Sequence, residues 1–250
     1  MLVMDNISAR EKRIEIWKKV LEDFKGKPRV ESKIYDRFNM EEYNNLPKKY
    51  EKTDVEIIQK DCIYAAIDNY RLGMKPLLLN MASEVRAGGG VRSGSSAQEE
   101  ELFRRSNYFL HLHQGYYPLS ELMTIVSRGV IFYRLDAKDN YNLMKFPTKI
   151  DCIAAAAIRH PLVTVNGDRF KKKEDAELCK EKIRMLFYSA YKEGNDCLVL
   201  SAWGCGAFGG PTEHIAKIFK QVVQENEGRF KKIVFAIFDY YNYNRFKSNF

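Results

Sequence analysis

The sequence predicts an α/β fold in which helices cover a central, mostly parallel sheet. From Thr53 onward, strand patterns and helix patterns alternate along the chain, which is typical of layered α/β domains. Residues 75–81 are apolar on both faces of the expected strand, as a parallel strand covered by helices requires. Two glycine-rich loops each follow a strand and precede a helix, where open α/β sheets bind ligands.

The first 52 residues are expected to form a helical extension. Residues 8–25 have the pattern of an amphipathic helix that begins with a capping box of Ser8 and Glu11. Its apolar face is made of Ile14, Trp17, Leu21 and Phe24. Residues 29–52 are polar and rich in tyrosine, without a clear period. We therefore divide the chain into an extension, residues 1–52, and a main domain, residues 53–250.

The main domain contains alternating predicted elements. Strands are expected at residues 55–59, 75–81, 129–135, 152–158, 197–202 and 232–238. Helices are expected at residues 63–70, 98–113, 174–193 and 211–223. The four alanines of residues 152–158 would also suit a buried helix, but their position between loops favours a strand. Residues 239–250 are expected to be a polar, aromatic tail, and residues 114–127 fit neither pattern.

The composition is that of a globular protein. Of the 250 residues, 45% are hydrophobic and 30% are charged. No apolar run approaches the ~18 residues of a membrane span, and the N-terminus lacks a secretory signal pattern. The five cysteines are widely spaced without a C-x-x-C pair, so reduced thiols are expected rather than disulfides or zinc ligands. These features predict an intracellular protein, cytoplasmic or nuclear, without a metal site.

The chain is basic, which indicates an anionic partner. Its net charge is +8 and its isoelectric point is near 9.1. The basic residues are dispersed, and the densest run, residues 171–173, suits a solvated loop. Direct nucleic-acid binding is the least favoured explanation, because no aromatic-rich recognition motif accompanies the charge.

The first glycine loop combines features of phosphate binding and of proton transfer. Gly88, Gly89 and Gly90 follow the strand at residues 75–81, and after seven residues comes the run Gln98 to Glu101. Consecutive glycines let the backbone approach a ligand closely, and a helix N-terminus attracts anions.

Helix stabilisation alone would also account for these acidic residues. Ser96 and Glu99 fit a capping box, while Glu100 with Arg104 and Glu101 with Arg105 fit i,i+4 ion pairs. Helix stabilisation does not account for the three glycines, however. Their combination with the acidic run therefore favours a functional site.

The second glycine loop, residues 202–211, suits a diphosphate. Four glycines surround Phe208, and two such loops on neighbouring strands can bind a diphosphate through backbone N–H groups. Gly204, Gly206 and Gly209 also match the dinucleotide-binding fingerprint G-x-G-x-x-G. That alternative is weak, because only one strand follows and no acidic residue ends it about 20 residues on. A tight strand-to-helix turn is a further alternative.

Together the two loops resemble a known family. The run GGG, VRSGSSA, QEE (residues 88–100) and the run AWGCGAFGGP (residues 202–211) are similar to the motifs of poly(ADP-ribose) glycohydrolases (PARG), in particular the microbial branch. The resemblance covers residues 53–239 and implies a macrodomain-like, three-layer α/β/α sandwich. Ala87 stands where proline is common in the family, and Gly210 where asparagine is frequent.

The resemblance also implies roles for individual residues. Glu100 would protonate the leaving oxygen of a ribose–ribose bond and then activate water, and Glu99 would hold a ribose hydroxyl. Asp61 would recognise adenine, although it equally suits a helix N-cap. The remaining expected substrate-binding residues are Asn80, Gly88, Gly89, Gly90, Val91, Gln98, Gly204, Cys205, Gly206, Ala207, Phe208 and Gly209.

The expected activity is hydrolysis of ADP-ribose polymers. The partners implied are ADP-ribose and poly(ADP-ribose) on modified proteins, and no metal or redox cofactor is called for. Two alternatives remain open: a module that binds ADP-ribose without cleaving it, and a hydrolase that removes single ADP-ribose units from side chains.

Overall fold

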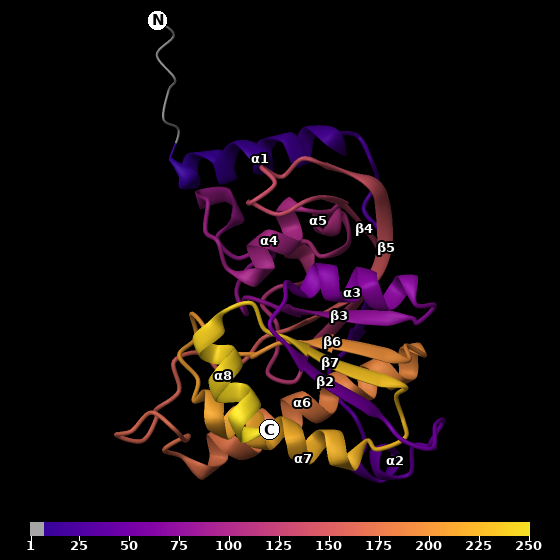
Figure 1. Cartoon of the computed structure of the whole chain (residues 1–250), viewed down its shortest axis with the longest axis vertical. Coiled ribbons are helices and arrows are strands. Elements are labelled where there is room, and N and C mark those ends of the chain that lie inside the picture. The colour runs from indigo at the N-terminus through magenta and orange to yellow at the C-terminus, as the bar shows by residue number, and fades with distance from the viewer. Residues whose placement is uncertain (1–7) are drawn as a thin grey trace, which may run out of the picture.

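A seven-stranded mixed sheet forms the centre of the computed structural model, which describes residues 8–250 (Figure 1). The strand order is β1-β4-β5-β3-β6-β7-β2. The five strands from β5 to β2 run parallel, whereas β1, β4 and β5 are antiparallel neighbours. The strands are β1 Lys33–Tyr35, β2 Asp54–Ile58, β3 Pro76–Met81, β4 Thr124–Arg134, β5 Leu143–Ala155, β6 Cys197–Leu200 and β7 Lys232–Ala236.

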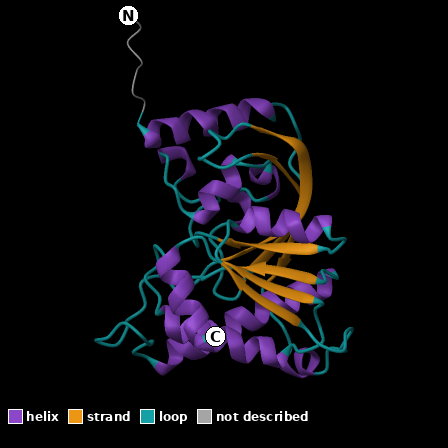
Figure 2. Cartoon of the chain, viewed as in Figure 1, coloured by secondary structure: helices purple, strands orange, loops and turns teal. Residues whose placement is uncertain are grey.

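Helices cover both faces of this sheet and form the expected three layers (Figure 2). One core contains side chains of α1 (Ala9–Asp23), α3 (Cys62–Arg71), α4 (Gln98–Arg104) and α5 (Tyr108–His111). The opposite core contains side chains of α6 (Lys173–Glu193), α7 (Thr212–Glu225) and α8 (Tyr240–Asn249). The short elements are α2 (Met40–Asn44), η1 (Val91–Ser93) and η2 (Gln114–Tyr116).

Strand β3 lies near the middle of the sheet and is buried on both faces, as predicted. Leu77 and Leu79 belong to the core beneath α6 and α7, whereas Leu78 belongs to the core beneath α3. This alternation follows from the two-residue period of a strand. The consequence for function is that β3 and its following loop rest on a rigid, well-packed base.

The first 52 residues contribute a strand as well as helices. The capping box of Ser8 and Glu11 starts α1, as predicted. Its buried residues are Ile16, Trp17 and Val20, so of the four residues of the expected apolar face only Trp17 is buried, and Leu21 is 41% exposed. Strand β1 pairs with β4 at the edge of the central sheet. The division at residue 53 stays a prediction.

Two predicted elements differ from the structure. The expected helix at residues 98–113 is two helices, because the backbone between them pairs with β4: Tyr133 N–H donates to the carbonyl of Arg105, and Ser106 bridges to Phe132. The expected tail is helix α8, whose N-cap Asp239 accepts a hydrogen bond from the backbone of Asn242. Of residues 152–158, those up to Ala155 belong to strand β5, as preferred over a helix, and residues 156–158 lie outside it.

Candidate active site

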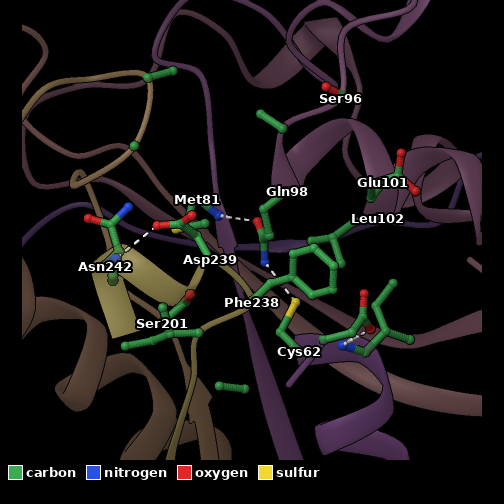
Figure 3. A pocket seen from close by; sticks show the side chains of 18 of the residues that line it. Cys62, Met81, Ser96, Gln98, Glu101, Leu102, Ser201, Phe238, Asp239 and Asn242 are labelled. Carbon is green, nitrogen blue, oxygen red and sulfur yellow. Dashed lines mark hydrogen bonds between the residues drawn. The ribbon is translucent and has the colours of Figure 1, made fainter. Parts of the chain in front are cut away.

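The sheet brings the two glycine loops to the same edge. Strands β3 and β6 are parallel neighbours, so their carboxyl ends, and the loops that follow, lie together as predicted. Beside them is a cavity of about 450 Å³ (Figure 3). Among the predicted site residues, those that line it are Asp61, Gln98, Gly204, Gly206, Ala207 and Phe208.

The second glycine loop presents free backbone donors to this cavity. Within residues 8–250, the N–H groups of Gly206, Ala207 and Phe208 donate no hydrogen bond, whereas those of Cys205 and Gly209 bond to carbonyls inside the loop. A run of free amide donors is a typical anion-binding arrangement. Cys205 and Gly209 do not line the cavity and instead shape the turn.

Helix α4 starts without the predicted capping box. Its N-cap is Ala97, and no side chain caps it, so the prediction for Ser96 and Glu99 was wrong. The physical reason is that the carboxyl of Glu99 accepts hydrogen bonds elsewhere. It turns toward β3 and the first glycine loop.

Glu99 is buried beneath the first glycine loop, where three hydrogen-bond donors surround its carboxyl. Its Oε1 accepts from Asn80 Nδ2 (3.3 Å) and from the backbone N–H of Gly88 (3.2 Å), and its Oε2 accepts from Ser83 N–H (2.8 Å). The residue is 3% exposed. Burial raises the pKa of Glu99 to about 8, with a smaller contribution from the charge of Glu100, although the three donors oppose the shift.

Glu100 is held by the same loop from its other side. Its Oε1 accepts a hydrogen bond from Gly90 N–H at 2.8 Å, and within residues 8–250 its buried Oε2 has no partner. Gly89 lies against both carboxyls, since a Cβ there would stand 2.6 Å from Glu100 Oε1 and 3.1 Å from Glu99 Oε2. Neither carboxyl lines the cavity itself. Both lie directly behind the glycine loop.

The i,i+4 ion pairs expected in α4 do not form. Arg104 pairs with Glu101, at 2.7 Å, and Arg105 pairs with Asp61, at 2.7 Å. Glu100 takes part in no salt bridge of the described residues, because both arginines are drawn to other carboxylates. Its carboxyl is therefore not neutralised by a fixed cation.

Asp61 has the structural role that the sequence left open. Its Oδ1 accepts from the N–H groups of Ile63 and Tyr64, so it caps α3, while Oδ2 bonds to Arg105. Asp61 also lines the cavity. Its expected contact with adenine is therefore compatible with this position and stays a prediction.

Gln98 joins β3 to α4. Its Oε1 accepts from Met81 N–H (2.9 Å), and its Nε2 donates to Leu79 O (2.6 Å). These bonds orient the start of the helix against the end of the strand.

Five further predicted residues do not line the cavity. Asn80 is fully buried and holds Glu99, and Gly88, Gly89, Gly90 and Val91 form the loop over the two carboxyls. Their contacts with a substrate stay predictions.

Some cavity residues escaped the sequence analysis. Phe238, Arg13, Lys138 and Tyr141 all line the cavity. Phe238 lies two residues after the end of β7 and is 62% exposed, so the rule that ligands bind at the carboxyl ends of strands could have identified it. Arg13 lies on the first helix and Lys138 and Tyr141 lie between β4 and β5. No pattern in the sequence identifies these three residues as part of the cavity, and only the tertiary structure places them there.

Within residues 8–250, no group of three or more His, Cys, Asp or Glu side chains is placed to hold a metal ion. No helix of that part of the chain is long and apolar enough to span a membrane.

Comparison with known proteins identifies the family of this chain. Residues 7–134, just over half of the chain, match the family model "Microbial-type PARG, catalytic domain". A comparison with curated protein sequences found no match.

Several solved structures share the fold. The poly(ADP-ribose) glycohydrolase of Thermomonospora curvata is 23% identical with a TM-score of 0.81, and the alignment covers 96% of this chain and 100% of that one. Its complex with the inhibitor ADP-HPD is 22% identical, with a TM-score of 0.80 and the same coverage. The enzyme of Deinococcus radiodurans, in complex with ADP-ribose, is 23% identical with a TM-score of 0.73, over 92% of this chain and 96% of that one. The family model matches more than half of the chain, and this chain therefore belongs to the family of microbial-type PARG catalytic domains.

Proposed function

We propose that this protein hydrolyses the ribose–ribose O-glycosidic bonds of poly(ADP-ribose) and releases ADP-ribose. The observation that carries the proposal is the position of Glu100. Its carboxyl is fixed by Gly90 N–H, keeps a free oxygen among the described residues, and lies behind a loop of glycines next to the cavity. A carboxyl that is held at one oxygen and has its other oxygen unbonded can give a proton to a sugar oxygen that approaches past the glycines.

The cavity accommodates the rest of an ADP-ribose unit. Its volume of about 450 Å³ lies within the range of small-ligand sites, roughly 300–1,000 Å³. The free N–H groups of residues 206–208 suit the diphosphate. The ring of the exposed Phe238, with Leu102 next to it in the lining (Figure 3), suits the flat face of a base.

Glu100 would act twice on the ribose next to the glycine loop, first as acid and then as base. As the acid, its carboxyl gives a proton to the bridging oxygen while the bond from that oxygen to the anomeric carbon breaks. A water molecule then attacks the anomeric carbon and loses a proton to the Glu100 carboxylate, which restores the acid. Without side chains, Gly89 and Gly90 let the sugar approach the carboxyls closely. Glu99, bonded to Gly88, would position the sugar hydroxyl.

The test is product analysis with a protein that carries poly(ADP-ribose). Free ADP-ribose as the main product supports the proposal. Removal of single ADP-ribose units from a mono-modified protein, with the polymer left intact, would favour the second enzyme activity. Binding without release of any product would favour a non-catalytic module. We also propose that the protein acts inside the cell, because its five cysteines are free thiols.

Glu100→Gln should lower kcat by ~10²–10⁴, the effect of losing a general acid. The affinity for ADP-ribose should stay within about twofold, because the amide has the same shape and the diphosphate contacts remain. Steady-state kinetics and calorimetric titration measure the two quantities. The control is Glu177→Gln on α6, whose exposed side chain contacts Lys173. Unchanged kcat in Glu100→Gln would refute the assignment.

A further inference from the structure

Three arginines hold the backbone of the first glycine loop, and two of them come from the N-terminal helix. In Figure 1, α1 lies alongside α4 and the loop that precedes it. Three consecutive carbonyl groups of that loop each accept a hydrogen bond from a different arginine. The bonds are Arg10 Nε to Ser93 O (2.8 Å), Arg13 Nε to Gly94 O (2.7 Å) and Arg104 Nη2 to Ser95 O (2.5 Å).

Gly94 shows how closely the helix approaches the loop. Its φ is +77°, and a Cβ at this position would stand 2.7 Å from the carbonyl oxygen of Arg10 and 3.1 Å from Ile14 Cγ1. Any larger residue would push the helix and the loop apart, so glycine permits this contact. The close contact between α1 and the loop therefore depends on a glycine at position 94.

A continuous path of hydrogen bonds leads from this contact to Glu100. The N–H groups of Ser93 and Ser95 both donate to the carbonyl of Gly90, at 3.0 and 3.1 Å. The N–H of Gly90 in turn donates to Glu100 Oε1 at 2.8 Å. A displacement of the loop carbonyls thus moves the donor that fixes the carboxyl of Glu100.

A second contact supports the glycines from below. The ring of Trp17 on α1 packs against Phe103, with 6.2 Å between centroids. Phe103 lies beneath Gly88, where a Cβ would stand 2.7 Å from the ring. Helix α1 therefore supports both ends of the loop that covers the two glutamates.

We propose that α1 belongs to the catalytic apparatus, with Arg10 and Arg13 as positioning residues that fix Glu100 through the backbone of residues 90–95. The inference rests on the proposed role of Glu100. Arginine suits the task because its guanidinium is permanently charged and donates in a fixed plane, so its bonds to carbonyls are short and directional. Neither arginine forms a salt bridge with any of residues 8–250, which leaves the loop carbonyls as their partners.

The test compares the double variant Arg10→Gln/Arg13→Gln with the wild type. Amide hydrogen exchange, followed by mass spectrometry, should become about tenfold faster in residues 90–97, because their restraint is lost. The kcat for poly(ADP-ribose) should fall by about 10–100-fold, the scale of a small misplacement of a catalytic group. The Kd for ADP-ribose, measured by calorimetry, should change by less than about twofold, because the cavity contacts with the diphosphate remain.

The matched control is Lys18→Gln/Lys19→Gln. It removes the same charge from exposed positions of the same helix and should behave as the wild type. Unchanged exchange in residues 90–97, or an equal effect of the control, would overturn the proposal. Weaker ADP-ribose binding with unchanged kcat would also overturn it, because Arg13 lines the cavity and would then act as a binding residue.

The single variants Arg10→Lys and Arg13→Lys cover the case in which the double variant does not fold. They keep the charge and the aliphatic stem but lose the Nε donor, so a smaller fall in kcat with the same local increase in exchange is expected. Wild-type kcat together with wild-type exchange in both would contradict the positioning role.

The exchange measurement does not depend on the activity. If the wild type releases no ADP-ribose, the proposed function fails, while the support of the loop by α1 is still tested.

Discussion

At the scale of single residues, Glu99 has a position that makes folding sensitive to pH. Its pKa rises from 4.5 in an exposed state to about 8 in the fold, chiefly through burial. The folded chain thus binds a proton that the unfolded chain has already released between these pH values. Its contribution to stability is complete below pH 4.5 and is lost as the pH rises toward 8, with a slope of at most about 1.4 kcal/mol per pH unit.

Glu99→Gln should remove this dependence, because the amide stays neutral. The free energy of unfolding of the variant, relative to the wild type, should increase by about 1–4 kcal/mol from pH 5 to pH 8. Urea unfolding at several pH values measures it. Glu177→Gln serves as the control and should differ from the wild type by a constant amount. A constant difference for Glu99→Gln as well would mean that the buried carboxyl is ionised throughout.

A substitution at Gly89 tests whether catalysis depends on the space between the two glutamates. Its φ is +52°, and a Cβ would press on both carboxyls. Gly89→Ala should lower kcat by about 10²-fold through their displacement. The control is Gly167→Ala, which has a similar φ of +69° but open space around it. Both should lose roughly 1–2 kcal/mol of stability from the left-handed backbone, measured by urea unfolding, and equal kcat values in the two variants would contradict the expectation.

At the scale of elements, α8 shows why a helix can be missed. Its sequence is polar and has a single buried residue, Phe246, so the apolar stripe that predicts a helix is absent. Tertiary packing supplies the stability instead, because the ring of Phe246 lies 5.0 Å from that of Phe235 and 6.0 Å from that of Phe219. This packing also places Asp239 and Asn242 in the lining of the cavity.

Phe246→Ala should therefore destabilise the protein by about 3–5 kcal/mol, the usual cost of removing a buried aromatic ring. The comparison is Tyr240→Ala in the same helix, where 66% of the residue is exposed and a change within about 0.5 kcal/mol is expected. Urea unfolding followed by circular dichroism measures both. A loss below 1 kcal/mol for Phe246→Ala would show that α8 docks weakly.

At the scale of the whole molecule, the net charge of +8 should guide a polyanionic substrate to the cavity. Raising NaCl from about 20 to about 200 mM shortens the screening length from roughly 20 to 7 Å, so kcat/KM on long poly(ADP-ribose) should fall by about tenfold. The kcat at saturation should change by less than about twofold, since the reacting groups are buried. A dimer of ADP-ribose units, with fewer charges, is the comparison and should show a weaker dependence. A kcat/KM independent of salt would exclude this steering.

The layers of the fold could be predicted from the sequence alone, and so could the meeting of the two glycine loops at one edge of the sheet. Apolar runs such as residues 76–81 and the glycines after two strands are local patterns, and local backbone chemistry fixes their conformations. The alternation of strands and helices then places both loops at one edge of the sheet, since parallel strands end on the same side.

The partners of the acidic residues, in contrast, follow from the packed fold and could not be predicted from the sequence. Ser96 and Glu99 satisfy the local rule for a capping box, yet the carboxyl of Glu99 bonds to Ser83, Asn80 and Gly88. Likewise, Arg105 pairs with Asp61 rather than with Glu101. A buried charged or polar group takes the partners that the packed fold brings to it, and those partners come from distant parts of the chain. For the same reason the contact of α1 with the glycine loop has no signature in the sequence.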